Sequence, residues 1–213
     1  MAKLNDSLLA GASGKLNGCV IYKVGKDTYA RKLADTVSNP RTEEQTLQRS
    51  KLPGAQTMFR AMRGSLLESV NAIAARENER RSGYHWFLHA NMNMFGANQY
   101  IDYPRLVLTA GSLQLPFALK AAGSGEGYLE LEWMDNSSTV TAQSTDRLLV
   151  AAIFDDEPYL PVMLDVEEFC RSDRHGIVNL PEGTWTTAHL YCFFGAEDKK
   201  RYSPCMYFSV SKS

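Results

Sequence analysis

Two histidines with the spacing of paired metal ligands are the first candidates for chemistry in this 213-residue sequence. His85 and His89 stand four residues apart in a segment of helical pattern, residues 84–95, which places both imidazoles on one helix face. Zinc proteases carry a glutamate between two such histidines, and this sequence has none there and no identifiable third ligand. We therefore rank the pair as a weak metal candidate and expect packed or hydrogen-bonded histidines, with no metal or other cofactor.

One tryptophan is the candidate for a ligand contact. Trp185 follows Pro181 and Gly183, a combination typical of an exposed loop, and an exposed indole offers a flat apolar face to a ligand. Trp133 instead alternates with Leu129 along a β-pattern, which predicts a buried side chain. Trp185 is therefore the candidate ligand-binding residue, with a glycan as the ligand class.

The motifs that identify common enzyme classes are absent from the sequence. It contains no Gly-x-Ser-x-Gly nucleophile elbow, no Walker A loop and no Rossmann glycine fingerprint. Its four cysteines form no Cys-x-x-Cys pair, so zinc-ribbon spacing is also absent. We expect a protein that is not an enzyme, and a metal-dependent enzyme built on the two histidines is the most distant alternative.

Charge is divided unevenly along the chain. Residues 1–105 carry 15 Lys or Arg and 9 Asp or Glu, whereas residues 106–213 carry 8 and 15. A basic half can serve nucleic acid or an acidic protein surface. Because the cations are dispersed, we disfavour nucleic acid and expect a protein partner, either a second copy or another subunit. No apolar run reaches the ~18 residues of a membrane span, and the N-terminus lacks the apolar core of a secretory signal, which predicts a cytoplasmic protein.

The predicted secondary structure that positions these residues changes from strand to helix at residues 39–49. Pro40 favours an extended Asn39 and removes one backbone donor. Thr42 and Gln45 have capping-box spacing, which predicts that a helix begins directly after Thr42. These four residues are therefore assigned a structural task as linker and helix cap.

The N-terminal half is predicted to combine a β-hairpin with two or three helices. Residues 19–24 and 28–33 are rich in β-branched and aromatic side chains and flank a Gly-Lys-Asp turn. Pro53 and the following glycine are expected to end or kink the first helix. Apolar residues then recur at helical spacing over residues 55–70 and again over residues 84–95.

The second half has the pattern of short strands separated by turn residues. The expected strands are residues 127–133, 147–154, 161–166, 176–180, 188–194 and 205–210. Six or seven short strands in about 100 residues are typical of an antiparallel sandwich. We therefore predict an α+β fold, with a hairpin and helical region over residues 1–105 and an immunoglobulin-like β-sandwich over residues 106–213.

Two resemblances follow from the motifs. The elements that carry the first are Gly11-x-x-Gly14-Lys15, Asn39-Pro40-Arg41-Thr42-x-x-Gln45-x-x-Arg49 and Ile101-Asp102-Tyr103-x-x-Leu106. They resemble an uncharacterised bacterial family from gut anaerobes, a domain of unknown function, which offers no activity and no catalytic residues to carry over to this sequence. The β half, with Leu129-x-Leu131-x-Trp133 and Leu180-Pro181-x-Gly183, is similar to a fibronectin type III or immunoglobulin-like module.

The block at residues 39–42 is also similar to one in small, phage-derived structural proteins. We therefore expect a non-enzymatic structural or assembly protein of phage or other mobile-element origin, which contacts another subunit through its N-terminal half. The alternative is a glycan-binding module that uses Trp185 and neighbouring sandwich loops.

Overall fold

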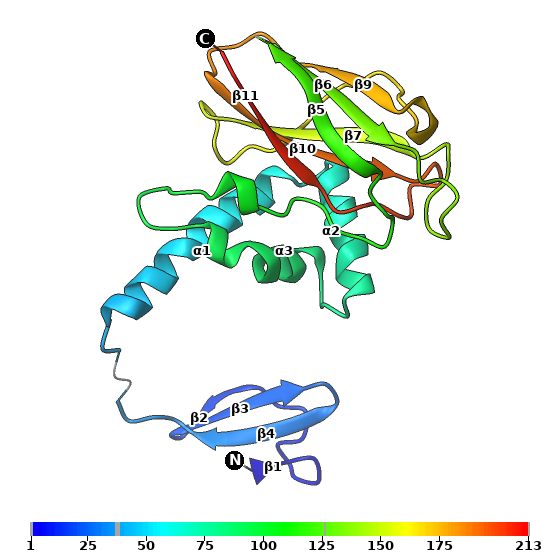
Figure 1. Cartoon of the computed structure of the whole chain (residues 1–213). Coiled ribbons are helices and arrows are strands. Elements are labelled where there is room, and N and C mark those ends of the chain that lie inside the picture. Colours follow the sequence, from blue (N-terminus) through cyan, green and yellow to red (C-terminus); the bar gives the residue numbers. More distant parts are fainter. Residues whose placement is uncertain (1, 37–38, 126, 213) are drawn as a thin grey trace. The chain divides into compact units, whose positions relative to one another are not determined.

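The computed structural model describes residues 2–36, 39–125 and 127–212, which form two compact units (Figure 1). The first unit spans Met1–Thr42 and the second spans Glu43–Ser213. The expected boundary between residues 105 and 106 falls inside the second unit. This is because the helices and one sheet of the sandwich contribute to the same hydrophobic cluster.

The first unit is a small antiparallel sheet. The predicted hairpin is present as β3 (Cys19–Val24) and β4 (Asp27–Lys32), and the turn contains Gly25 with a φ of 63°. Two further strands, β1 (Ala2–Lys3) and β2 (Gly14–Leu16), complete the order β1-β4-β3-β2. Both additions are short, which explains why the residue pattern alone did not predict them.

Three helices open the second unit: α1 (Glu43–Ala61), α2 (Leu66–Glu77) and α3 (Gly83–Asn91). Helix α1 begins one residue after Thr42, as the capping-box spacing predicts. The apolar face expected over residues 55–70 is divided between α1 and α2, because the chain turns at Gly64 with a φ of 76°.

The sequence predicts that Pro53 and the following glycine end or kink the first helix, and an end there is wrong, because α1 continues through this proline. A proline inside a helix removes one backbone hydrogen bond. The next turns of α1 bury Ala55, Met58 and Phe59. Tertiary burial of this face offsets the loss and keeps the helix intact.

Seven strands form the predicted antiparallel sandwich (Figure 1). One sheet has the order β5-β6-β9, with β5 (Phe117–Gly125), β6 (Tyr128–Met134) and β9 (His175–Asn179). The other has the order β11-β10-β7-β8, with β7 (Arg147–Phe154), β8 (Val162–Met163), β10 (Thr187–Gly195) and β11 (Met206–Ser211). All six predicted strands are present, whereas β5, which is rich in alanine and glycine, was not predicted.

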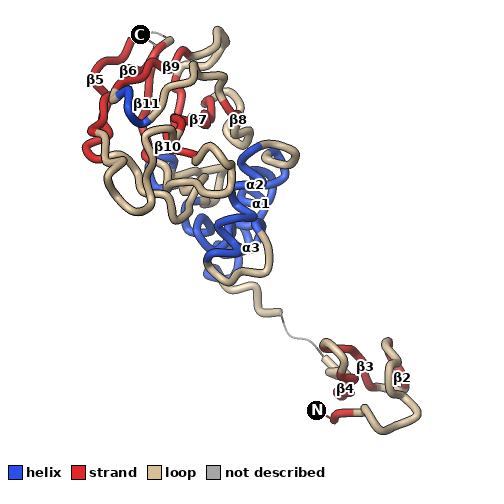
Figure 2. Tube along the Cα trace, turned by 90° about the vertical axis from the view of Figure 1, so that its right-hand side faces the viewer, coloured by secondary structure: helices blue, strands red, loops and turns tan. Residues whose placement is uncertain are grey.

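The sheet that contains β7 and β10 is covered on both faces. Leu190 and Phe194 face the other sheet and belong to the interior cluster of the sandwich. Tyr191 and Phe193, on the opposite face of the same strand, pack in the cluster that includes all three helices. The second unit therefore has three layers, helices, middle sheet and outer sheet, and Figure 2 shows the helices gathered beside β7 and β10.

A buried ion pair joins the connections at one end of the sandwich. Arg171 is fully buried, and its guanidinium lies 3.1 Å from Asp146 Oδ2 and donates to Asn136 Oδ1 at 2.5 Å and to the Gln114 carbonyl at 2.8 Å. Gln114 precedes β5, whereas Asn136 and Asp146 lie at the two ends of the connection from β6 to β7, so one side chain ties its own segment to two other connections. Within the described part of the chain, Asp146 Oδ1 is the one buried side-chain polar atom without a hydrogen-bond partner.

Because the middle sheet is buried on both faces, we predict that two adjacent residues of β10 both contribute strongly to stability. Phe193→Ala and Phe194→Ala should each lower the free energy of unfolding by about 3–5 kcal/mol, because each removes a fully buried ring from a different face of the middle sheet. The measurement is chemical denaturation, with Phe117→Ala, whose ring is 50% exposed, as a control expected to cost less than about 1 kcal/mol. A small effect of Phe193→Ala alone would show that the helices do not pack on this sheet.

Candidate functional site

The histidine pair identified in the sequence lies on the exposed side of α3. His85 Nδ1 lies 2.8 Å from Ser82 Oγ, and His89 Nε2 lies 3.0 Å from the Arg80 guanidinium. Because arginine can only donate, His89 accepts at Nε2. No group of three or more His, Cys, Asp or Glu residues within the described ranges could hold a metal ion, so no third ligand joins the pair.

Trp185 is buried, and the expectation that it is exposed is wrong. Its side chain is 4% exposed and its Nε1 donates to the Pro181 carbonyl at 2.9 Å. One neighbour of the indole is the Phe154 ring at 5.3 Å, and the Lys212 ammonium lies 3.8 Å from its centroid. The loop therefore folds back over its own tryptophan, and the indole offers no free face to a glycan.

The four linker and cap residues lie at the junction of the two units. Asn39 and Pro40 have no regular secondary structure. Thr42 is the last residue of the first unit and occupies the N-cap position of α1, and Gln45 is the third residue of that helix. The motif therefore ends the linker and starts the helix, which is a structural task.

In the first unit, the described residues cover one face of the sheet and leave the other without such a cover. Ile21 is the one buried hydrophobic residue among its described positions, at 5% exposure, and Thr28 lies beside it on the same face. The segment before β2 folds over this face, since Gly11 N donates to Thr28 Oγ1 at 2.9 Å and Thr28 N donates to Asn5 Oδ1 at 2.9 Å. The opposite face has no such cover from described residues of its own unit.

The open face combines aromatic rings with cations, and we call it the tyrosine face. By strand register its members are Lys3, Lys15, Val20, Tyr22, Val24, Asp27, Tyr29 and Arg31. The rings of Tyr22 and Tyr29 stack with centroids 5.9 Å apart, and Val24 is 59% exposed. The Asn5 amide and the Lys3 ammonium, which lies 3.0 Å from Asp27, lower the pKa of the Asp27 carboxyl. Of its four charged side chains, three are cationic, so the face suits an acidic partner surface.

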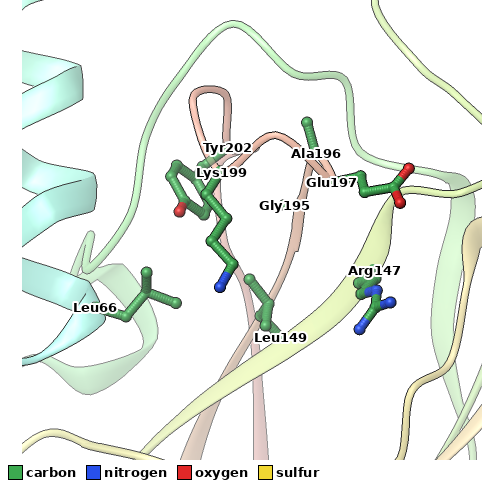
Figure 3. Close-up of a pocket in the computed structure, with 8 residues that line it drawn as sticks. All are labelled: Leu66, Arg147, Leu149, Gly195, Ala196, Glu197, Lys199 and Tyr202. Carbon is green, nitrogen blue, oxygen red and sulfur yellow. The ribbon is translucent and has the colours of Figure 1, made fainter.

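A cavity of about 620 Å³ lies in the second unit, where the helical layer meets the end of the middle sheet (Figure 3). Its lining includes Leu66 of α2, Arg147 and Leu149 of β7, Gly195 of β10, and Lys199 and Tyr202 of the following loop. Sequence reasoning missed this site because its residues come from three distant segments, and none of them belongs to a recognisable motif.

A second group that the sequence did not reveal surrounds His189. Its ring stacks on Tyr103 with centroids 3.7 Å apart and planes 9° apart, and its Nδ1 lies 2.8 Å from the Tyr207 hydroxyl. Tyr191 donates to the Tyr103 carbonyl at 2.9 Å. Burial lowers the pKa of His189, and the Asp155 carboxylate opposes this shift. The group attaches the 3₁₀ turn at Tyr103–Arg105 to the sheet.

The arrangement of the strands defines the structural class of the second unit. An antiparallel sandwich with three strands facing four and Greek-key connections is the immunoglobulin-like arrangement, here with a helical layer on the four-stranded sheet. The particular family follows from the sequence match. Residues 11–209 match the family described as "Family of unknown function (DUF6266)", and the chain belongs to this family.

Other comparisons supply weak likenesses. A β-1,2-glucanase from Parabacteroides distasonis is 13% identical with a TM-score of 0.34, and the match covers 47% of this chain and 13% of the glucanase chain. The fibronectin type-III domain of human fibronectin type III domain containing protein 3 is 12% identical with a TM-score of 0.33, and the match covers 49% and 90%. These scores are too low to carry an argument about function. No curated protein matches the chain, and no described helix is long and apolar enough to cross a membrane.

The lowered pKa of His189 predicts a pH dependence of stability. As the pH falls below the ordinary histidine value of 6.5, the unfolded chain takes up this proton before the folded chain does. The contribution of His189 is therefore present above pH 6.5 and is lost below it. The free energy of unfolding, measured by denaturant titration, should fall less steeply with acidification in His189→Asn than in the unsubstituted protein. Equal slopes would contradict this assignment.

Proposed function

We propose that this protein is a non-enzymatic assembly protein whose N-terminal sheet docks on another subunit through its tyrosine face. The observation that carries the proposal is the incomplete core of the first unit, where Ile21 is the one buried hydrophobic residue at the described positions. The second unit, in contrast, contains two clusters of buried hydrophobic residues.

A sheet of this size needs an additional source of stability. Units below about 40 residues usually depend on disulfides, metals or association. The first unit has a single cysteine, Cys19, which excludes an internal disulfide, and its described residues form no group suited to a metal ion. Five of its large hydrophobic side chains are exposed: Leu8, Leu9, Leu16, Val24 and Leu33. Association is the remaining source, and Val24, which belongs to the tyrosine face, is the apolar side chain of this group that docking there would cover.

Charge favours a second copy of the chain as the partner. Residues 1–42 carry 7 Lys or Arg and 3 Asp or Glu, whereas residues 43–213 carry 16 and 21. The first unit of one copy is thus electrostatically complementary to the second unit of another. A contact between two different surfaces of the same chain is heterologous and forms a closed ring or an open filament. The resemblance of residues 39–42 to phage-derived structural proteins agrees with such an assembly.

The test is solution mass by light scattering, over a range of protein concentrations and at low and high salt. We expect a defined oligomer that weakens as salt increases, because screening reduces attraction between exposed charges. Val24→Asp places a negative charge on the tyrosine face at a side chain already 59% exposed, and it should shift the oligomer toward monomer. The matched control is Val140→Asp in the second unit, at a side chain that is fully exposed.

Three outcomes separate the alternatives. A monomer at all concentrations would contradict self-association and show that another protein or the chain itself covers the sheet. An oligomer equally sensitive to both valine substitutions would place the contact elsewhere. An oligomer unaffected by salt would contradict the electrostatic part of the argument.

A further inference from the structure

We propose that the cavity beside Tyr202 is a binding site for an organic carboxylate with an apolar body, such as a short aliphatic acid. This site lies within the second unit, and the proposal is independent of the assembly function. Its volume, about 620 Å³, lies within the range of small-molecule sites.

The apolar part of the site comes from two layers of the fold. Leu66 begins α2 and Leu149 lies on β7, so the helical layer and the sheet each supply one side chain. Gly195 keeps space at the end of β10. A Cβ at this position would lie 2.8 Å from Leu149 Cδ1 and 3.0 Å from Tyr202 Cε1. The cavity therefore has an apolar surface that an aliphatic chain can cover.

Tyr202 provides the observation that points to a ligand. Its side chain is 2% exposed and its ring packs near Phe193, with centroids 6.3 Å apart. Its hydroxyl has no hydrogen-bond partner among residues 2–36, 39–125 and 127–212, yet the residue lines the cavity. Burial, reinforced by Asp198, raises the pKa of Tyr202, so the hydroxyl remains a donor at neutral pH. The hydroxyl is not among the buried polar atoms that lack a partner, so it is accessible from the cavity and can donate to an acceptor bound there.

The neighbouring charges select an anion. In Figure 3 the Lys199 ammonium and the Tyr202 hydroxyl point to the same side, toward Leu66 and Leu149. The ammonium of Lys199 forms no ion pair with any described residue, whereas Arg147 is already paired with Glu168. Two donors, one of them charged, match the two oxygens of a carboxylate.

The number of charges favours a monoanion over a phosphate. The cavity lining carries Arg147 and Lys199 as cations and Glu197 as an anion. Glu168 neutralises Arg147 from outside the lining. One ammonium thus remains for the ligand, and Glu197, whose carboxylate points away from Lys199 in Figure 3, disfavours a second negative charge.

The experiment uses the full chain and follows amide chemical shifts by NMR during titration with hexanoate and with its neutral counterpart hexanamide. Hexanoate at millimolar concentration should shift the amides of Leu149, Gly195 and Tyr202, and hexanamide should bind at least about tenfold more weakly. A peptide with a C-terminal leucine carboxylate, compared with its amide, tests whether the carboxylate comes from a free acid or from a chain terminus.

Two substitutions remove one donor each. Tyr202→Phe keeps the packed ring and removes only the hydroxyl, and Lys199→Gln keeps most of the side chain and removes the charge. Each should weaken hexanoate binding about tenfold. Lys200→Gln, the adjacent loop position outside the lining, makes the same change in net charge and should leave binding unchanged. Glu197→Gln should strengthen binding, since it removes the negative charge at the cavity.

Several results would overturn the proposal. The first is equal affinity for hexanoate and hexanamide. The second is a set of amide chemical-shift changes confined to residues outside the cavity. The third is no binding at millimolar concentration of either hexanoate or the peptide with a free C-terminal carboxylate. If Lys200→Gln weakened hexanoate binding as much as Lys199→Gln does, the weakening would come from the change in net charge and not from a contact between Lys199 and the ligand. If Tyr202→Phe bound hexanoate with unchanged affinity, the Tyr202 hydroxyl would not contact the ligand.

Discussion

Burial of β7 and β10 on both faces is the constraint on which the second unit depends. Strands of this kind have apolar side chains in both directions, so each face needs a partner layer. The sheet β5-β6-β9 supplies one layer and the three helices supply the other. A boundary between a helical domain and a sandwich domain is therefore absent, since separating the two would expose residues such as Tyr191 and Phe193 to water.

Local pattern predicted much of this fold but could not predict what long-range packing decides. The strand at Arg147–Phe154 and the helix start after Thr42 follow from composition and capping, which act over a few residues. Pro53 is different, because the burial that keeps α1 continuous depends on residues far away in the sequence. The same holds for Trp185, whose neighbour Lys212 is 27 positions later, and for the cavity at Tyr202.

The two units divide the properties of the chain between them. The second unit has the buried clusters and the buried ion pair of Arg171, so its shape is determined by its own contacts. The first unit has a sheet whose stability its own side chains supply only in small part. Under the assembly function proposed above, the contact would supply the remaining stability, and any ordering of the sheet at that contact would lower the affinity for the partner.

The order of the layers along the chain also affects synthesis on the ribosome. Helices α1 to α3 end at Asn91, whereas their partner strands β7 and β10 extend to Phe154 and Gly195. The apolar helix faces therefore emerge about 100 residues before the last strand that covers them, and at about 5–20 residues per second this interval lasts several seconds. Over that time the apolar faces of the nascent helices are exposed to chaperones and to neighbouring chains.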